Sequence, residues 1–216
     1  MSEVERRAVV FANGRIGDYE RLRGLIRDDD WIICADGGAR HALKMGLSPD
    51  VLLGDFDSLD GDIVEEISRA GAEVLRVPTE KDQTDTHLAL DLALSRGARE
   101  ILVLGAIGDR LDHTMANILL LPKLAVHGAN VTIVDEKNTL RVTNGRIGLQ
   151  GRQGEFVSLI PLTPEVLGVT TAGLKYPLRR GKLTWGESTG VSNEFTAETA
   201  EVTIESGWLL VVLASD

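Results

Sequence analysis

The chain has 216 residues, enough for one large domain or for two small domains that each bury a core. With 43% hydrophobic and 26% charged residues and a mean hydropathy near zero, its composition is that of a folded globular protein and argues against disorder. The formal net charge of -10 disfavours nucleic acid and anionic membranes as partners, because most of the surface would repel their phosphates.

The sequence contains no run of about eighteen apolar residues that would predict a membrane span. Its first residues show neither the apolar segment nor the cleavage site of a signal peptide, so we expect a cytoplasmic protein. Cys34 is the only cysteine, which excludes an intramolecular disulfide. Its apolar neighbours predict a buried strand thiol rather than a catalytic nucleophile.

In the first part of the chain, short apolar runs alternate with amphipathic stretches. The expected strands cover residues 8–14, 31–38, 51–58, 73–78, 100–108 and 130–138, and the expected helices cover 18–29, 39–46, 60–71, 84–97 and 111–128. This alternation is typical of βαβ units. It predicts an N-terminal doubly wound, mostly parallel α/β domain over residues 1–137.

After about residue 138 the helical period disappears, and short strand-like runs are separated by Gly, Pro, Asn and Thr. These runs cover residues 139–143, 155–162, 168–178, 182–186, 191–195, 200–205 and 208–215. Their spacing predicts a C-terminal all-β domain over residues 138–216, an antiparallel sandwich or a small barrel. Trp185 and Trp208 are expected in its core, although Trp185 or Tyr176 could instead stack on a cation.

In open α/β sheets, ligands bind beyond the carboxyl ends of the strands. Those ends carry the segments Asn13-Gly14, Asp36-Gly37-Gly38, Gly54 to Ser58, and Gly105 to Arg110. Asp55 and Asp57 are two residues apart on an expected extended segment, so their carboxylates are predicted to point to the same side. With no His or Cys cluster at ligand spacing, magnesium fits this pair better than zinc. A turn with an Asx-type cap is the structural alternative.

The segment from Lys81 to Asp85 leads into the fourth expected helix. Thr84 is a natural N-cap, and Asp85 falls in the first turn. Capping does not explain Lys81 and Asp82, which stand at a helix N-terminus that also offers backbone N–H groups to phosphate. We therefore expect this segment to serve a ligand.

The glycines between 105 and 108 let the backbone approach a ligand closely. Arg110 beside them is suited to clamp a phosphate, or else is a solvated surface residue. Asp112 and His113 follow in the first turn of the next expected helix. The other histidines, His41, His87 and His127, lie within helical stretches and are expected to be structural or exposed.

Taken in order, the segments DGG, GDFDS, KDQTD, GAIGDRLDH and GVSNEF, at residues 36–38, 54–58, 81–85, 105–113 and 190–195, resemble the motif series of the thiamine pyrophosphokinases. The resemblance covers nearly the whole chain, including the change from an α/β half to a β half. Residues 173–178 and 184–186, GLKYPL and TWG, look like that family's thiamine-binding domain.

The resemblance implies transfer of the pyrophosphoryl group of ATP to the hydroxyl of thiamine, giving thiamine diphosphate and AMP. By similarity, the catalytic residues that surround Mg²⁺ and the phosphates are Asp55, Asp57, Asp85 and Asp112. The residues implied to bind ATP are Asp36, Gly37, Gly38, Lys81, Asp82, Gln83, Thr84, Gly108, Arg110 and His113, and those implied to contact thiamine are Tyr176, Ser192 and Asn193. The family also implies a homodimer, with the active site between the α/β domain of one subunit and the sandwich of the other.

One position departs from the family pattern, because Asp109 stands where the family usually has glycine. It could add a metal ligand, cap the following helix, or change the nucleotide preference. Two other functions compete with the kinase. A haloacid-dehalogenase-like phosphatase would use the DFDS segment as a nucleophile strand, and a non-catalytic nucleotide sensor would keep the fold without turnover.

Overall fold

The computed structural model describes residues 6–215 and divides into two compact units, the first ending at Glu136 and the second beginning at Lys137. In the first unit the strands are β1 (Ala8–Phe11), β2 (Trp31–Ala35), β3 (Val51–Gly54), β4 (Glu73–Arg76), β5 (Glu100–Leu104) and β6 (Asn130–Val134). The helices are α1 (Tyr19–Arg23), the 3-10 turn η1 (Asp36–Gly38), α2 (Ala39–Lys44), α3 (Gly61–Arg69), α4 (Asp85–Ser95) and α5 (Leu111–Val126).

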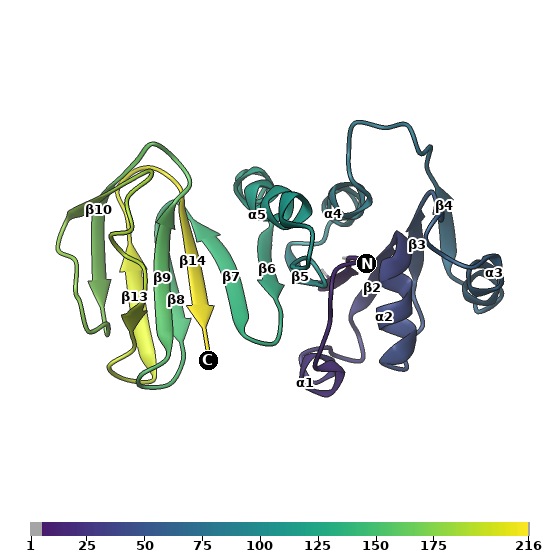
Figure 1. Ribbon diagram of the computed structural model, residues 1–216, viewed down its shortest axis with the longest axis horizontal. Coiled ribbons are helices and arrows are strands. Elements are labelled where there is room, and N and C mark those ends of the chain that lie inside the picture. The colour runs from purple at the N-terminus through teal and green to yellow at the C-terminus, as the bar shows by residue number, and fades with distance from the viewer. Residues whose placement is uncertain (1–5, 216) are drawn as a thin grey trace, which may run out of the picture. The chain divides into compact units, whose positions relative to one another are not determined.

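The strands of the first unit lie in the order β6-β5-β1-β2-β3-β4, and every adjacent pair is parallel. Helices α1, α2 and α3 cover one face of the sheet, and α4 and α5 cover the other (Figure 1). Because both faces are covered, the central strands are apolar throughout, whereas the edge strand β4 is partly exposed. The predicted doubly wound α/β fold is confirmed.

The order of the strands decides where the site forms. The chain runs from β1 outward to β4, and α4 then carries it back across the sheet to β5, on the other side of β1. The strand order reverses at this point, which is where open α/β sheets leave a crevice at the carboxyl edge. The segments after β1, β2, β3 and β5 therefore meet at one edge.

One local prediction differs from the structure, whereas the helix expected over residues 111–128 is confirmed. The first expected helix shortens to the five residues of α1, because Gly24 caps it and turns follow. Helix α5, in contrast, continues through Pro122 to Val126. None of the helices in the described part of the chain is long and apolar enough to cross a membrane.

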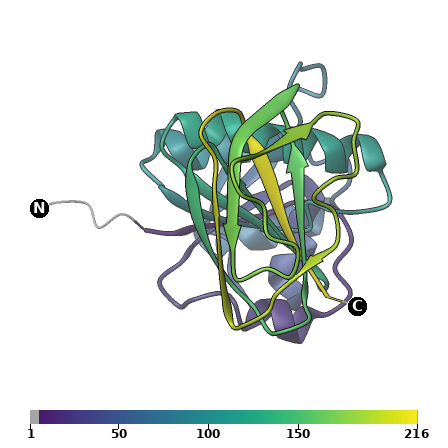
Figure 2. The same ribbon diagram turned by 90° about the vertical axis from the view of Figure 1, so that its left-hand side faces the viewer.

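Among the described residues of the second unit, the regular elements are all strands. They are β7 (Asn138–Thr143), β8 (Arg146–Gln150), β9 (Phe156–Pro161), β10 (Glu165–Ala172), β11 (Gly181–Thr184), β12 (Asn193–Glu194), β13 (Thr199–Thr203) and β14 (Leu209–Ala214), drawn from two directions in Figures 1 and 2. Antiparallel pairing gives the orders β12-β9-β14-β7 and β11-β10-β13-β8. Alternate residues of both sheets form one core, around Leu159, Val202 and Phe195. Of the two predicted alternatives, the unit is the sandwich.

Candidate active site

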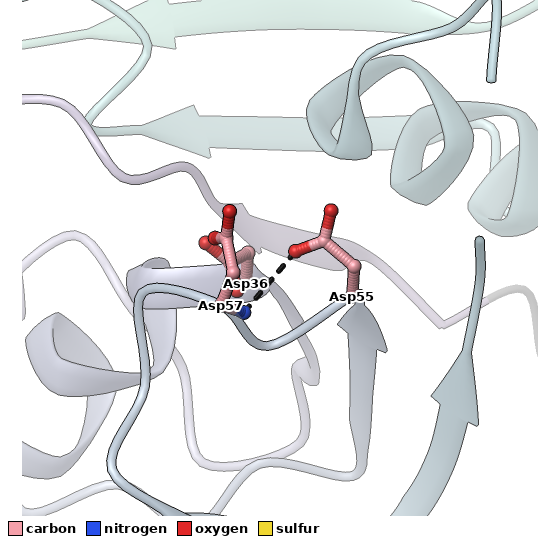
Figure 3. Close-up of side chains that lie close together, drawn as sticks. All are labelled: Asp36, Asp55 and Asp57. Atoms are coloured by element: carbon pink, nitrogen blue, oxygen red, sulfur yellow. Dashed lines mark hydrogen bonds between the residues drawn. The ribbon is translucent and has the colours of Figure 1, made fainter. Parts of the chain in front are cut away.

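Three carboxylates converge beyond the ends of β2 and β3. Oxygen atoms of Asp36, Asp55 and Asp57 all lie within 4.8 Å of one another (Figure 3). The backbone N–H of Asp57 donates to Asp55 Oδ1 at 3.2 Å, and the Ser58 hydroxyl donates to Asp36 Oδ2. Asp36 Oδ1 is buried without a hydrogen-bond partner. An unpartnered buried oxygen among carboxylates fits a hard cation, because magnesium prefers oxygen ligands.

The backbone brings Asp55 and Asp57 together in a way that differs from the prediction. Phe56 between them adopts a left-handed conformation, with φ of 64°, and its side chain is buried in the core below. The two carboxylates are therefore adjacent because the chain turns at Phe56, and the predicted extended segment is wrong. Asp36 is likewise left-handed, with φ of 47°, which turns the chain from β2 into η1. Such backbone strain in non-glycine residues is concentrated at functional sites.

The closeness of the acidic groups changes their pKa values. Repulsion from Asp55 raises the pKa of Asp57. The pKa of Asp55 is lowered, chiefly by the hydrogen bond from the Asp57 backbone and further by Lys81. Burial raises the pKa of Asp85, despite the nearby Lys81. Asp57 and Asp85 are therefore stronger bases than Asp55.

Lys81 lies between acidic groups that come from two different segments. Its Nζ is 3.5 Å from Asp55 Oδ2 and 3.2 Å from Asp85 Oδ1, and it also donates to the Pro78 carbonyl at 3.0 Å. Burial lowers the pKa of Lys81, but the two carboxylates outweigh burial and raise it. Thr84 is the N-cap of α4, since its hydroxyl accepts the His87 backbone N–H at 3.2 Å. The predicted cap is thus confirmed, and Asp85 occupies the first turn.

A pocket of about 560 Å³ opens at this edge of the first unit. Of the predicted ligand-binding residues, it is lined by Asp36, Lys81, Gln83, Thr84, Asp85, Gly108, Arg110 and His113. Asn13, Gly14 and Asp109, which the sequence places at strand ends without a defined role, also line it. So do residues with no sequence signal, Arg15, Thr79, Thr114 and Asn117 among them. Asp55, Asp57, Asp82 and Asp112 are outside its lining.

Asn13, to which the sequence analysis gave no individual role, follows β1. The Asn-Gly pair ends an apolar run at the same edge as the aspartates. Asn13 Nδ2 lies 3.4 Å from Ser58 Oγ, which in turn donates to Asp36. Asn13 therefore belongs to the hydrogen-bonded surroundings of the acidic group.

Two glycines allow the backbone segments of this edge to approach each other. Gly105 has φ of +68°, and a Cβ there would lie 2.5 Å from the Ala12 carbonyl oxygen. A Cβ on Gly38 would overlap the Phe11 carbonyl. Larger residues at these positions would push the loops after β1, β2 and β5 apart.

The loop after β5 is held by the start of α5. The Gly108 N–H donates to the Thr114 hydroxyl at 3.1 Å, and the buried Asn117 amide donates to the Ala106 carbonyl at 2.8 Å. Helix α5 begins at Leu111 with Arg110 as its N-cap and no side-chain capping bond. Of the three roles considered for Asp109, helix capping is therefore wrong.

Asp112 forms an ion pair with Arg110 and does not join the group of Asp36, Asp55 and Asp57. Arg110 Nη2 and Nε lie 2.6 Å and 3.3 Å from the two carboxylate oxygens, and the hydrogen bond lowers the pKa of Asp112. Both side chains are more than half exposed. The group of three aspartates includes neither Asp112 nor Asp85.

His41 has a structural role in the first unit. His41 Nε2 contacts the Gly14 carbonyl at 2.7 Å and its Nδ1 contacts the Tyr19 hydroxyl at 2.8 Å, which supports the loop after β1. Burial lowers the pKa values of His41 and His87. Cys34 is fully buried, and burial raises the pKa of its thiol, so the predicted strand thiol is confirmed.

Comparison with known proteins identifies the family. The model of the thiamin pyrophosphokinase catalytic domain matches residues 22–133, and that of the thiamin pyrophosphokinase vitamin B1 binding domain matches residues 138–209. The chain belongs to the thiamin pyrophosphokinase family. This confirms the predicted resemblance and the prediction of a thiamine diphosphokinase enzyme.

Relatives and solved structures of the family cover nearly the whole chain. Thiamine pyrophosphokinase of Bacillus subtilis is 30% identical, over 90% of this chain and 92% of its own length. Thiamine pyrophosphokinase 1 of Oryza sativa is also 30% identical, over 92% of this chain and 84% of its own length. The crystal structure of the Bacillus subtilis enzyme superposes with a TM-score of 0.88 at 28% identity, covering 98% of this chain and 100% of that one. The structure from Geobacillus thermodenitrificans gives 0.86 at 31% identity, covering 97% and 98%.

The second unit contains the residues that the family resemblance assigned to thiamine. Tyr176 is 60% exposed, and its backbone is held by Asn193, whose Oδ1 accepts from Tyr176 N at 2.9 Å and whose Nδ2 donates to Tyr176 O at 2.8 Å. Asn193 is buried, so its amide serves the backbone of Tyr176. Ser192 is left-handed, with φ of 58°, and its N–H donates to Ser158 Oγ at 3.0 Å.

Trp185 and Trp208 were both expected in the sandwich core, but neither is fully buried. Trp185 is 66% exposed, so its predicted place in the sandwich core is wrong. Trp208 is half-buried beside β14, where its backbone N–H donates to Thr163 Oγ1 at 3.1 Å. The exposed indole of Trp185 follows the end of β11 and is accessible to a ligand. Stacking on a cation, the alternative predicted for Trp185, therefore stays a prediction.

Proposed function

We propose that the pocket of the first unit binds ATP and that the adjacent aspartates hold Mg²⁺ on its phosphates for pyrophosphoryl transfer to thiamine. The observation that carries the proposal is the juxtaposition of Asp36, Asp55 and Asp57, with an unpartnered buried oxygen, beside a pocket that contains Lys81 and Arg110. A triphosphate would otherwise be repelled by carboxylates. A divalent ion removes this repulsion.

The donor set fits magnesium. Carboxylate oxygens are present without His or Cys ligands, and magnesium keeps several waters and phosphate oxygens in its shell, so few protein ligands are needed. When bound, the ion would neutralise phosphate charge and stabilise the leaving group. Asp55 and Asp57 are proposed as direct ligands with support from Asp36. Asp85 and Asp112 stay predictions as ligands, because Lys81 and Arg110 pair with them.

The enzyme's own residues position the reactants and move the proton. Lys81 and the α4 N-terminus face the phosphates, with Thr84 and Asp85 in the pocket wall. Phosphoryl-group transfer to an alcohol requires an in-line hydroxyl and acceptance of its proton. Asp85, whose pKa is raised by burial, would take that proton, whereas Asp57 would be a weak base once it holds the ion.

The nucleotide released separates the candidate functions. The protein is incubated with ATP, Mg²⁺ and thiamine, and the products are resolved by chromatography. Thiamine-dependent AMP is expected. ADP or free phosphate would support the phosphatase and contradict the kinase, and tight ATP binding without turnover would support the sensor.

We further propose that thiamine binds to the second unit, at Tyr176 and near Ser192 and Asn193, and that the enzyme is a homodimer with each site completed by a partner. Tyr176 and Trp185 are exposed aromatic side chains, and aromatic rings attract cations such as the permanently cationic thiazolium. Exposed apolar residues on α5, Leu111, Met115 and Leu119, are consistent with a covered face in an oligomer. The cytoplasmic location expected from the sequence stays a prediction.

Subunit mixing tests the shared site. Asp55→Asn and Tyr176→Ala should each be inactive alone, or nearly so. Unfolded and refolded together in equal amounts, they should recover about one quarter of the wild-type activity, because half of the dimers are mixed and each mixed dimer holds one intact site. No recovery in dimers shown to be mixed would contradict a site shared between subunits.

A further inference from the structure

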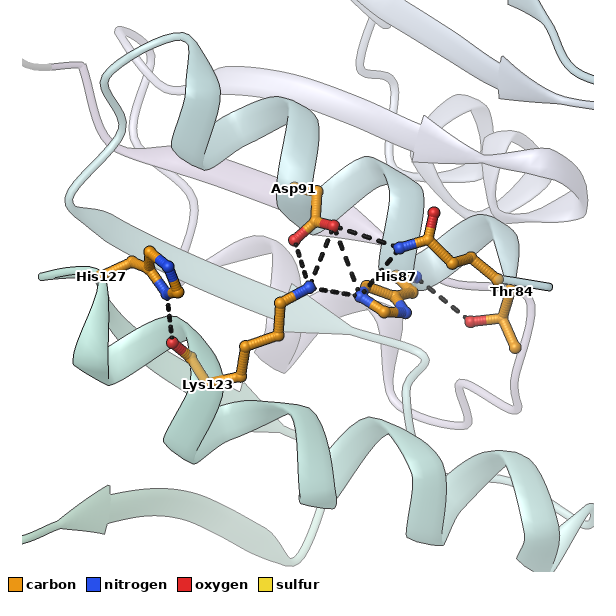
Figure 4. A network of polar contacts seen from close by, with 6 residues as sticks. Thr84, His87, Asp91, Lys123 and His127 are labelled. Carbon is orange, nitrogen blue, oxygen red and sulfur yellow. Dashed lines mark hydrogen bonds and ion pairs between the residues drawn. The ribbon is translucent and has the colours of Figure 1, made fainter.

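A polar cluster outside the acidic group links α4 to α5. It consists of His87 and Asp91 on α4 and Lys123 on α5 (Figure 4). Lys123 Nζ lies 2.8 Å from His87 Nε2 and 3.2 Å from each Asp91 carboxylate oxygen. The proposed chemistry uses none of these three groups, and none of them lines the pocket.

The cluster also holds a residue of the pocket wall. The side-chain nitrogen of Gln83 lies 3.3 Å from His87 Nε2 and 3.4 Å from Asp91 Oδ2. His87 holds the neighbouring residue as well, because its backbone N–H donates to the Thr84 hydroxyl. Both Gln83 and Thr84 line the pocket, so one histidine fixes two adjacent residues of its wall.

Hydrogen-bond chemistry determines which end of the Gln83 amide faces the cluster. A lysine ammonium has only donors, so His87 Nε2 must accept from Lys123 and its ring proton resides on Nδ1. Ionised Asp91 has only acceptors. Lys123 already takes the single lone pair of His87 Nε2, so the acceptor that Gln83 meets is the Asp91 carboxylate, and Gln83 must present its NH₂ group to it. This leaves its carbonyl oxygen as an acceptor for another donor.

We propose that His87, Asp91 and Lys123 are positioning residues that orient Gln83 in the pocket wall, so that its carbonyl oxygen accepts a hydrogen bond from the bound nucleotide. The inference rests on the proposal that this pocket holds ATP. Lys123 is the central element, because it fixes the acceptor state of His87 and neutralises Asp91. Without it, the Gln83 amide loses its defined orientation, and the α4 N-terminus loses a tether to α5.

A double-mutant cycle tests the inference. Lys123→Met should raise the KM for ATP about three- to tenfold, the effect of one misplaced hydrogen bond, with kcat within about twofold of wild type. Asp91→Ala should do the same, and Lys123→Arg should restore the KM because a guanidinium donates to the same acceptors. In a Gln83→Ala background, which raises the KM by itself, Lys123→Met should add little.

The matched control is Arg96→Met. Arg96 tethers the other end of α4 to β4, through a two-point ion pair with Glu73 at 2.5 Å and 2.8 Å. Its loss should lower the melting temperature at least as much as Lys123→Met but leave the KM for ATP unchanged.

The proposal is overturned if either Lys123→Met or Gln83→Ala leaves the KM for ATP unchanged. It is also overturned if the double variant raises this KM by the full product of the two single effects. The ATP site has a separate test in Asp55→Asn. If Asp55→Asn loses turnover and the effects of Lys123→Met and Gln83→Ala on the KM add fully, the proposed ATP site is supported and the role of the cluster is rejected.

Discussion

The ammonium group of Lys81 lies 3.5 Å from the carboxylate of Asp55, where it does electrostatically what a metal ion would do. On its other side is Asp85, at 3.2 Å. Both ion pairs are largely buried, with 12% to 22% of the side-chain surface of each partner exposed. Lys81 therefore compensates negative charge that the proposed magnesium ion would also compensate.

Removing this lysine should make the protein depend more on magnesium. Lys81→Met is expected to lower the free energy of unfolding by about 1 to 2 kcal/mol, because Asp55 and Asp85 lose their counter-ion. Millimolar Mg²⁺ without nucleotide should then raise the melting temperature more for Lys81→Met than for wild type. Lys81→Arg is the control that keeps the charge. Equal Mg²⁺ effects in Lys81→Met and wild type would contradict a common electrostatic role.

Asp55→Asn should abolish activity without unfolding the protein. We expect thiamine-dependent AMP formation to fall at least about a hundredfold, since catalysis by positioned charge is lost. The melting temperature should stay within a few degrees, because the substitution also relieves repulsion of Asp57. Glu66→Gln, on the exposed side of α3, is the control. A collapse of the fold would instead assign Asp55 a structural role.

Gly105→Ala should be much more destabilising than Gly46→Ala. Both glycines have positive φ, +68° and +70°, so both substitutions carry a backbone cost of about 1 to 2 kcal/mol. At Gly46 no atom lies within 4 Å of the added Cβ, whereas at Gly105 the Ala12 carbonyl is 2.5 Å away. Urea denaturation should show an additional loss of at least about 1 kcal/mol for Gly105→Ala. Equal losses would show that the loops adapt without cost.

Asp30→Asn should destabilise the protein at neutral pH and much less in acid. Arg7 Nη2 and the Arg27 backbone N–H lie 2.6 Å and 2.7 Å from Asp30 Oδ2. Burial raises the pKa of Asp30, but these partners outweigh burial and lower it. A lowered folded-state pKa means that the stabilisation is present above about pH 4, the unfolded value, and is lost as the pH falls through the folded value.

We therefore expect Asp30→Asn to cost about 2 to 4 kcal/mol at pH 7, measured by urea denaturation, and the difference from wild type to shrink below about pH 4. Asp29→Asn, at an exposed neighbouring carboxylate, should change little at either pH. A difference that persists unchanged at pH 3 would show that the ion pair is not its source.

Asn193→Ala should weaken thiamine binding through Tyr176. The substitution removes both hydrogen bonds to the Tyr176 backbone, and it leaves buried groups unpaired at a cost of about 1 to 3 kcal/mol in stability. The KM for thiamine should rise while the KM for ATP stays constant. Ser192→Ala, which keeps the backbone bond to Ser158, is the comparison. A parallel rise of both KM values would contradict an effect confined to the second unit.

Several features could be predicted from the sequence because they arise from local patterns. The alternation of apolar runs and helical stretches determines the order of the elements in the first unit, and the shift to closely spaced strands determines the second. The N-cap at Thr84 and the buried thiol at Cys34 follow from their immediate neighbours. The sequence also places aspartates at the strand ends, since parallel strands share one carboxyl edge.

The tertiary structure alone decided which of these aspartates meet. Asp36 joins Asp55 and Asp57 because β2 and β3 are neighbours in the sheet, and Phe56 turns the chain to let its side chain reach the core. Asp112 is held by Arg110, two residues away, although the sequence equally allowed it to face the other aspartates. The Gln83 amide contacts Asp91, which in turn contacts Lys123, forty residues further along the chain than Gln83. Local patterns specify what each segment becomes, whereas side-chain partners depend on contacts between distant segments, which form only when the chain has packed.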